Sequence, residues 1–210
     1  MKKTTRLFLV GLIASYGTAF GQSFQRADIP FSKNGDVFEN ALTGGLNNPQ
    51  FSEADFNNDG TPDLYIFDRN GNVHLTFLND GTPNEPSYTF APEYARNFPY
   101  CHDWVLLRDY NNDGAMDIFT HYTGAFKGMR VFRGFYNADN ELDFEVFNFY
   151  NNPYNAVYYE QINGNLTNLN ITQIDYPVID DINGDGDLDV LSFSIAGSYV
   201  EYYENRSVEY

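Results

Sequence analysis

The chain alternates between apolar and polar positions in short segments, a pattern that is typical of β-strands and not of amphipathic helices. Turn residues such as Asn70-Gly71 separate neighbouring segments, and Asn-Gly between two apolar runs is a strong hairpin signal. No helical periodicity of useful length follows the first 21 residues. The pattern therefore predicts an all-β protein built from antiparallel meanders, with strands over 64–68, 73–78, 87–91, 116–122, 129–135, 142–149, 188–195 and 199–203.

A nine-residue acidic segment with the pattern D-x-N-x-D-G-x-x-D occurs three times. The copies cover residues 55–63, 109–117 and 181–189, and each links two strand-like runs. Their first residues are 54 and then 72 positions apart, because a Tyr/Asn-rich insertion lies near residues 151–170. Repeats of this period indicate arrays or propellers.

The residue types in this segment point to a hard cation. Oxygen-bearing side chains at alternate positions can converge on one ion, and glycine at the sixth position allows the sharp turn that brings the ninth position back. Calcium suits such ligands better than magnesium, which demands a smaller and stricter octahedron. The sequence therefore predicts about three Ca²⁺ ions, one in each loop.

Two other kinds of loop share these residue types. An EF-hand or dockerin-type loop requires Glu at the twelfth position, where this chain has Ile66, Thr120 and Ser192. Ordinary solvated β-turns are also rich in Asp, Asn and Gly. Three copies with matched positions argue against that second reading.

The motif, followed each time by a Leu/Ile-rich strand, resembles the FG-GAP or VCBS repeat of secreted β-propellers. Residues 44–51 and 104–109 also resemble the starts of blades in secreted bacterial proteins. The resemblance covers residues 40–205 and fits the VCBS-like form better than the integrin-like one, because the Phe-Gly and Gly-Ala-Pro elements are not evident. It implies four-stranded blades with a calcium loop in each, in units near 40–95, 96–150 and 171–210.

The resemblance also implies which groups bind the ions. Carried over by position, the expected ligands are the side chains of Asp55, Asn57, Asp59 and Asp63 with the Thr61 carbonyl, those of Asp109, Asn111, Asp113 and Asp117 with the Ala115 carbonyl, and those of Asp181, Asn183, Asp185 and Asp189 with the Asp187 carbonyl. Propellers typically close with about 4–8 blades. Three units make an incomplete propeller, so we expect further blades from a longer chain or from self-association.

The first 21 residues have the features of a secretory signal peptide. Basic residues at positions 2, 3 and 6 precede the apolar run Leu7–Ala14, and small residues at 19 and 21 suit cleavage. The apolar run is shorter than the roughly 20 residues that a membrane-spanning helix needs. We therefore expect residues 22–210 to be secreted or held at the cell surface, without a transmembrane segment.

The net charge and the cysteine content restrict which partners and which cross-links are expected for this chain. The net charge is −17 with only 12 Lys and Arg, which disfavours nucleic acid because phosphate neutralisation needs clustered basic residues. The single cysteine, Cys101, permits no internal disulfide and is expected to be a small buried residue. The pairs Tyr158-Tyr159 and Tyr202-Tyr203 suggest a surface for a protein or carbohydrate ligand, with packing between blades as the alternative.

The sequence offers no sign of catalysis. His74, His102 and His121 stand apart without zinc-site spacing, and no nucleophile elbow or phosphate-cradling glycine loop occurs. We expect a non-enzymatic, secreted calcium-binding repeat protein that serves as a structural, adhesion or ligand-binding scaffold. The non-catalytic propeller portion of a larger secreted carbohydrate- or peptide-degrading enzyme, and a gene fragment without independent function, remain as alternatives.

Overall fold

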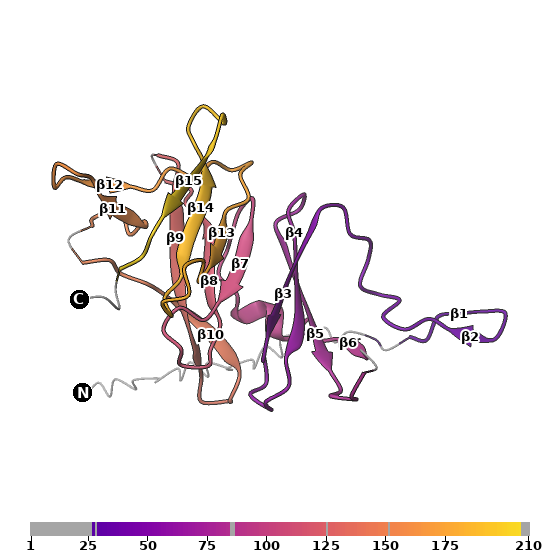
Figure 1. Cartoon of the computed structure of the whole chain (residues 1–210). Coiled ribbons are helices and arrows are strands. Elements are labelled where there is room, and N and C mark those ends of the chain that lie inside the picture. The colour runs from indigo at the N-terminus through magenta and orange to yellow at the C-terminus, as the bar shows by residue number, and fades with distance from the viewer. Residues whose placement is uncertain (1–26, 28, 85–86, 125, 151, 207–210) are drawn as a thin grey trace, which may run out of the picture. The chain divides into compact units, whose positions relative to one another are not determined.

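A computed structural model describes residues 27, 29–84, 87–124, 126–150 and 152–206 (Figure 1). The chain divides into two units, one up to Val37 and one from Phe38 onward. The described part of the first unit holds one short hairpin, β1 (Ser32–Lys33) and β2 (Asp36–Val37). The predicted signal peptide at residues 1–21 lies outside the described residues.

The second unit consists of antiparallel sheets that follow one another along the chain. Two are four-stranded meanders and one has three strands, and a separate hairpin lies in the insertion between the second and third sheets. Their strands are β3 (Pro49–Ala54), β4 (Asp63–Asp68), β5 (Val73–Asn79) and β6 (Tyr88–Phe90); β7 (Val105–Arg108), β8 (Asp117–His121), β9 (Met129–Tyr136) and β10 (Leu142–Val146); the hairpin β11 (Tyr158–Glu160) and β12 (Leu166–Asn168); and β13 (Val178–Asp180), β14 (Asp189–Phe193) and β15 (Val200–Tyr203).

The all-β prediction is confirmed, and the strands lie where the apolar alternation places them. The hairpin β11–β12 was not predicted, and within the described residues the third sheet has three strands, which are the run before the third loop and the two strands predicted after it. The described part of the chain contains one short 3₁₀ helix, η1 (Tyr94–Asn97), and no helix there is long and apolar enough to cross a membrane. Antiparallel sheets repeated in this way fit β-propeller-like repeats.

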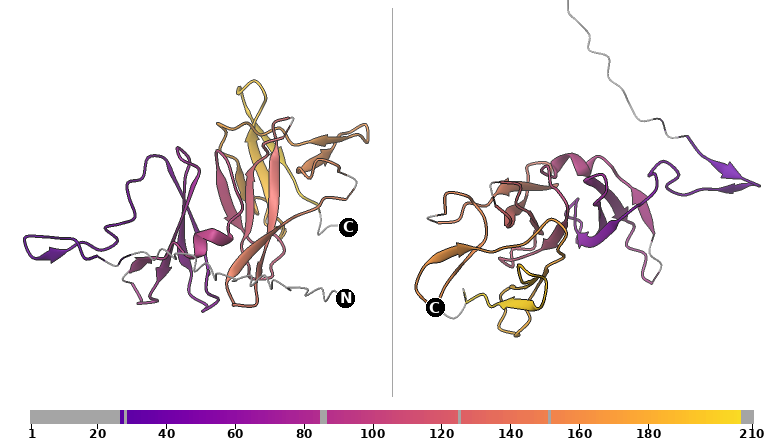
Figure 2. Two further views of the ribbon diagram at one scale, coloured as in Figure 1. Left: turned by 180° about the vertical axis from the view of Figure 1, so that it is seen from behind. Right: turned by 90° about the horizontal axis from the view of Figure 1, so that it is seen from above.

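The first strands of the three sheets lie next to one another although they are far apart in sequence. Strand β3 contacts β7, and β7 contacts β13 (Figures 1 and 2). Each sheet then continues outward from its first strand in chain order. The second sheet is therefore packed between the first and the third.

The second sheet is buried on both faces, and its side chains alternate between two hydrophobic clusters. Val105 and Leu107 of β7 join the cluster shared with the first sheet, whereas Leu106 joins the cluster shared with the third sheet. Successive residues of a strand point to opposite faces, so a sheet buried on both sides needs an unbroken apolar run. This requirement explains the sequence Trp104-Val-Leu-Leu107, in which all four residues are buried.

The cluster between the first and second sheets also encloses the ionisable side chains of Tyr65, His74 and Cys101. The ring of His74 lies 5.3 Å from that of Phe98, and its Nδ1 is 2.7 Å from the Tyr65 hydroxyl oxygen. Burial lowers the pKa of His74 to about 4. Burial also raises the pKa of Cys101 to about 12, so this thiol is unreactive near neutral pH, as expected of a small buried residue.

We expect His74 to make the fold sensitive to acid. The unfolded chain protonates this imidazole near pH 6.5 and the folded chain only near pH 4, so stability that is fully present above pH 6.5 is lost as the pH falls to about 4. Urea unfolding, with chelator present, measures the free energy of unfolding at pH 7 and at pH 4.5. Between these two pH values it should fall by about 2 kcal/mol less in His74→Gln than in the wild type. The control His102→Gln should lose as much as the wild type. An acid loss of equal size in all three proteins would contradict the assignment.

Candidate functional site

The three acidic segments fold into loops of one shape, each between the first and second strands of its sheet. Their positions are numbered here from one to nine. Glycine at the sixth position has a positive φ in every copy, 85° at Gly60, 88° at Gly114 and 98° at Gly186. The fourth position is also left-handed, at Asn58, Asn112 and Gly184. Glycine, and to a lesser degree asparagine, tolerates this conformation, which explains these residue types.

Side chains at the first, third and fifth positions turn toward the backbone of their own loop. In the first loop, the Asp55 carboxylate accepts hydrogen bonds from the amides of Asp59 at 3.1 Å and Gly60 at 2.8 Å. The Asn57 carbonyl oxygen also accepts from the Asp59 amide, and the Asp59 carboxylate accepts from the Thr61 amide at 2.7 Å. Oxygen atoms from three side chains are therefore gathered in one tight turn.

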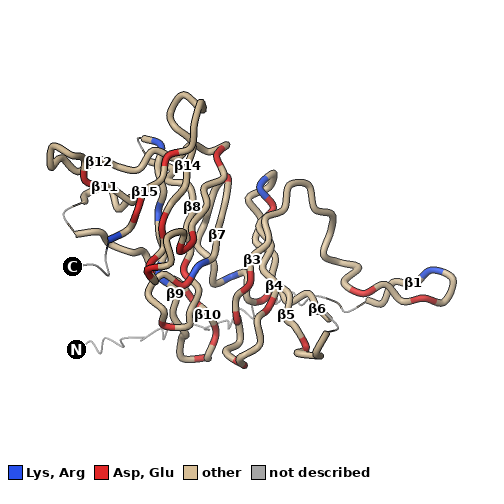
Figure 3. Tube along the Cα trace, in the orientation of Figure 1, with Lys and Arg blue, Asp and Glu red and all other residues tan. Residues whose placement is uncertain are grey.

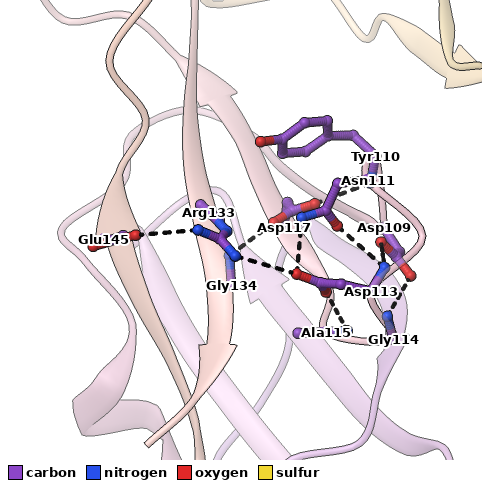
Figure 4. A network of polar contacts seen from close by, with 10 residues as sticks. All are labelled: Asp109, Tyr110, Asn111, Asp113, Gly114, Ala115, Asp117, Arg133, Gly134 and Glu145. Atoms are coloured by element: carbon purple, nitrogen blue, oxygen red, sulfur yellow. Dashed lines mark hydrogen bonds and ion pairs between the residues drawn. The ribbon is translucent and has the colours of Figure 1, made fainter. Parts of the chain in front are cut away.

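The second and third loops repeat these bonds. Gly114 donates to Asp109 at 2.9 Å, as Figure 4 shows, and Gly186 donates to Asp181 at 3.1 Å. In every loop the amide nitrogen of the third-position asparagine donates to the fifth-position carboxylate, and the seventh-position amide donates to that same carboxylate. The two donors and the acceptor are Asn57 and Thr61 to Asp59; Asn111 and Ala115 to Asp113; and Asn183 and Asp187 to Asp185.

The ninth position has a different environment, because Asp63, Asp117 and Asp189 are almost fully buried. Each carboxylate accepts one bond from the second-position amide of its loop and one from an amide on or just after the third strand of its sheet, and Asp189 also accepts a bond from the Tyr202 hydroxyl at 2.9 Å. The donor pairs are Phe56 and Asn79, Tyr110 and Gly134, and Ile182 and Asn205, at 2.7–3.2 Å. The ninth carboxylate thus ties the loop to the third strand. The pattern of side chains did not reveal these amide partners, because they are backbone groups.

The two kinds of carboxylate differ in acidity. Burial raises the pKa of Asp117 to about 6 and raises that of Asp63. The pKa of Asp59 is lowered, chiefly by the hydrogen bond from Asn57, and that of Asp113 is lowered, chiefly by the Ala115 amide. Position five is therefore the more readily ionised of the two.

The donor set suits a hard cation, since every predicted ligand is an oxygen atom. The structure brings together the first, third and fifth positions of each loop and holds the ninth on backbone amides. Within the described residues, no three His, Cys, Asp or Glu side chains are grouped as a metal cluster. Each carboxylate has more lone pairs than the amide hydrogen bonds it accepts, so lone pairs remain that can coordinate a cation.

The four tyrosines singled out in the sequence line a groove of about 1200 Å³ between the second sheet, the hairpin β11–β12 and the third sheet. Tyr158 packs against Phe149, with ring centres 5.9 Å apart, and Tyr159 packs against Tyr203 at 5.1 Å. The adjacent tyrosines of β11 therefore point to different sides, as strand geometry requires. Basic positions are scattered singly along the described trace and form no stripe (Figure 3).

Comparison with known proteins gave one match. The family model of the FG-GAP-like repeat matches residues 55–120, from the first position of the first loop, through the whole second loop, to Thr120 in β8. The third loop lies outside the matched residues. Neither the curated proteins nor the solved structures yielded a match.

We expect the ninth and fifth positions to respond differently to substitution in chelator. Asp117→Asn should lower the free energy of unfolding by about 2–4 kcal/mol, because an amide group cannot accept from both buried backbone donors. Asp113→Ala should cost less than about 1 kcal/mol, because that side chain is one-third exposed. Urea unfolding in EDTA measures both values. Equal losses would show that the two carboxylates play the same structural role.

Proposed function

We propose, from the premise that this is an FG-GAP repeat-containing protein, that it is a secreted calcium-binding repeat protein serving as a structural, adhesion or ligand-binding scaffold. The observation that carries the proposal is the repetition of one loop, with the same internal hydrogen bonds, in all three sheets. FG-GAP repeats are typical of extracellular proteins. The acidic composition and the scattered basic positions suit a protein or carbohydrate partner better than nucleic acid.

Calcium would be held by the oxygen atoms predicted from the motif. In the second loop these are the side chains of Asp109, Asn111, Asp113 and Asp117 and the carbonyl of Ala115. The ion would supply positive charge where three carboxylates stand within nine residues. The first and third loops offer the same donors at matching positions, so we propose one ion per loop.

The role proposed for calcium is structural. Each loop joins the first two strands of a sheet, and its ninth residue is bonded to the third strand, so an ion in the loop stabilises most of that sheet. Because the unfolded chain lacks a preformed site, binding free energy adds to folding free energy. The three sheets would then be blades of an incomplete propeller, with β3, β7 and β13 as their inner strands.

The tyrosine-lined groove is the surface that we propose for the ligand. It is larger than the roughly 300–1,000 Å³ typical of small-molecule pockets, which suits an extended partner such as a polypeptide segment or a sugar chain. Tyr158 offers a flat apolar face with a polar tip, and Tyr202 offers its ring while its hydroxyl donates to Asp189. Glu160 and Gln161 provide hydrogen-bonding groups nearby. A rigid calcium-stabilised frame would keep these side chains in place.

We expect calcium to raise the thermal stability of the purified chain. With a dissociation constant of about 10⁻⁴ M, 2 mM calcium would stabilise the folded state by roughly 2 kcal/mol for each occupied loop. Thermal unfolding followed by circular dichroism in EDTA and in 2 mM CaCl₂ measures the difference. Asp113→Ala should show a smaller calcium-dependent rise than the wild type. An identical melting temperature with and without calcium would overturn the proposal.

A further inference from the structure

The three loops differ in charge at one structurally equivalent position. The amides of Asn79, Gly134 and Asn205 are equivalent, because each donates to the ninth-position carboxylate of its own sheet. The residues immediately before them are Leu78, Arg133 and Glu204. The first loop therefore has a neutral side chain at this position, and the second has a permanent cation.

The side chain of Arg133 reaches the second loop. Its guanidinium lies 3.7 Å from the Asp113 carboxylate and 3.8 Å from the carboxylate of Glu145. Figure 4 shows the guanidinium between these two carboxylates. Glu145 stands directly opposite Arg133 in the register of β9 and β10. Arg133 is therefore held between a proposed calcium ligand and a second carboxylate on its own sheet.

The first loop supplies an internal comparison. Leu78 packs against the hydrophobic cluster between the first and second sheets and brings no charge to Asp59. The loop bonds themselves match in the two copies, since the fifth-position carboxylate accepts from the seventh-position amide at 2.7 Å in one and 2.9 Å in the other. The two loops therefore have similar geometry and differ in their electrostatics, because the second has a guanidinium beside its fifth-position carboxylate.

We propose that the Arg133 guanidinium competes with calcium for the carboxylates of the second loop. This competition lowers the calcium affinity of the second loop, so that the second loop fills at a higher calcium concentration than the first. Glu145 is the group that retains the guanidinium when the loop binds the ion. The inference rests on the proposed calcium function and adds an order of filling to it. The chain would then respond to calcium in stages instead of at one concentration.

The size of the effect follows from the exposure of the charges. The side chains of Arg133, Asp113 and Glu145 are 46%, 34% and 61% exposed, so water and salt weaken their interactions. A unit charge near a divalent ion in such surroundings should change the dissociation constant roughly three- to tenfold. The effect should shrink as the salt concentration rises.

The experiment follows each loop separately by NMR. The sixth-position amides of Gly60 and Gly114 donate to the first-position carboxylates of their loops, so their signals report on one loop each. In protein labelled with ¹⁵N-glycine and titrated with CaCl₂, we expect the Gly114 midpoint at three- to tenfold higher calcium than the Gly60 midpoint. Arg133→Gln should lower the Gly114 midpoint by a similar factor and leave Gly60 unchanged.

Two further variants separate the local effect from net charge. Lys127→Gln removes one positive charge between β8 and β9, at the end of these strands away from the second loop, and should move neither midpoint. Glu145→Gln removes the alternative partner of Arg133 and should raise the Gly114 midpoint. Glycine spectra in EDTA that match the wild type show that each variant is folded.

The outcomes distinguish the two levels of the proposal. Calcium-dependent shifts with a Gly114 midpoint that Arg133→Gln does not lower would overturn the role of Arg133 and leave the calcium function standing. An equal response to Lys127→Gln would also overturn it, because a general charge effect would then explain the change. Absence of calcium shifts at both glycines would overturn the calcium function itself.

Discussion

The buried carboxylate at the ninth loop position is the interaction on which each sheet depends. A carboxylate removed from water is costly unless hydrogen bonds replace its hydration. Asp63, Asp117 and Asp189 each accept hydrogen bonds from two backbone amides, one in the loop and one on or just after the third strand. One side chain therefore fixes the connection between the first two strands and its register with the third.

The residues of each loop therefore have two separate structural roles. The ninth residue faces inward and organises the sheet, whereas the first, third and fifth residues face the loop backbone near solvent. A sheet can therefore keep its shape through the inner carboxylate while the outer oxygens remain accessible. The different acidities of Asp117 and Asp113 reflect these two environments.

Much of the fold could be predicted from the sequence, because its signals are local. Strands such as β4 and β8 follow directly from apolar alternation after each loop, and the repeated spacing of Asp, Asn and Gly identifies the loops themselves. The amide partners of the ninth carboxylates could not be predicted, since Gly134 lies 17 residues from Asp117 and contributes only its backbone. The contact between Arg133 and Asp113 was missed for a similar reason, because strand pairing brings together residues that no motif connects. The hairpin β11–β12 was missed because its Asn-rich sequence has weak alternation.

The double burial of the second sheet has a consequence for how such a chain can change in evolution. Each of its faces is fitted to one neighbour, with Val105 and Leu107 serving one side and Trp104 and Leu106 the other. Duplication of a whole unit copies both faces together, so the new sheet brings an apolar face to each of the sheets beside it. Point substitutions on a single face lack that advantage, because they must be matched across the contact. Lengthening by entire units is therefore an easier route than gradual redesign of an individual sheet.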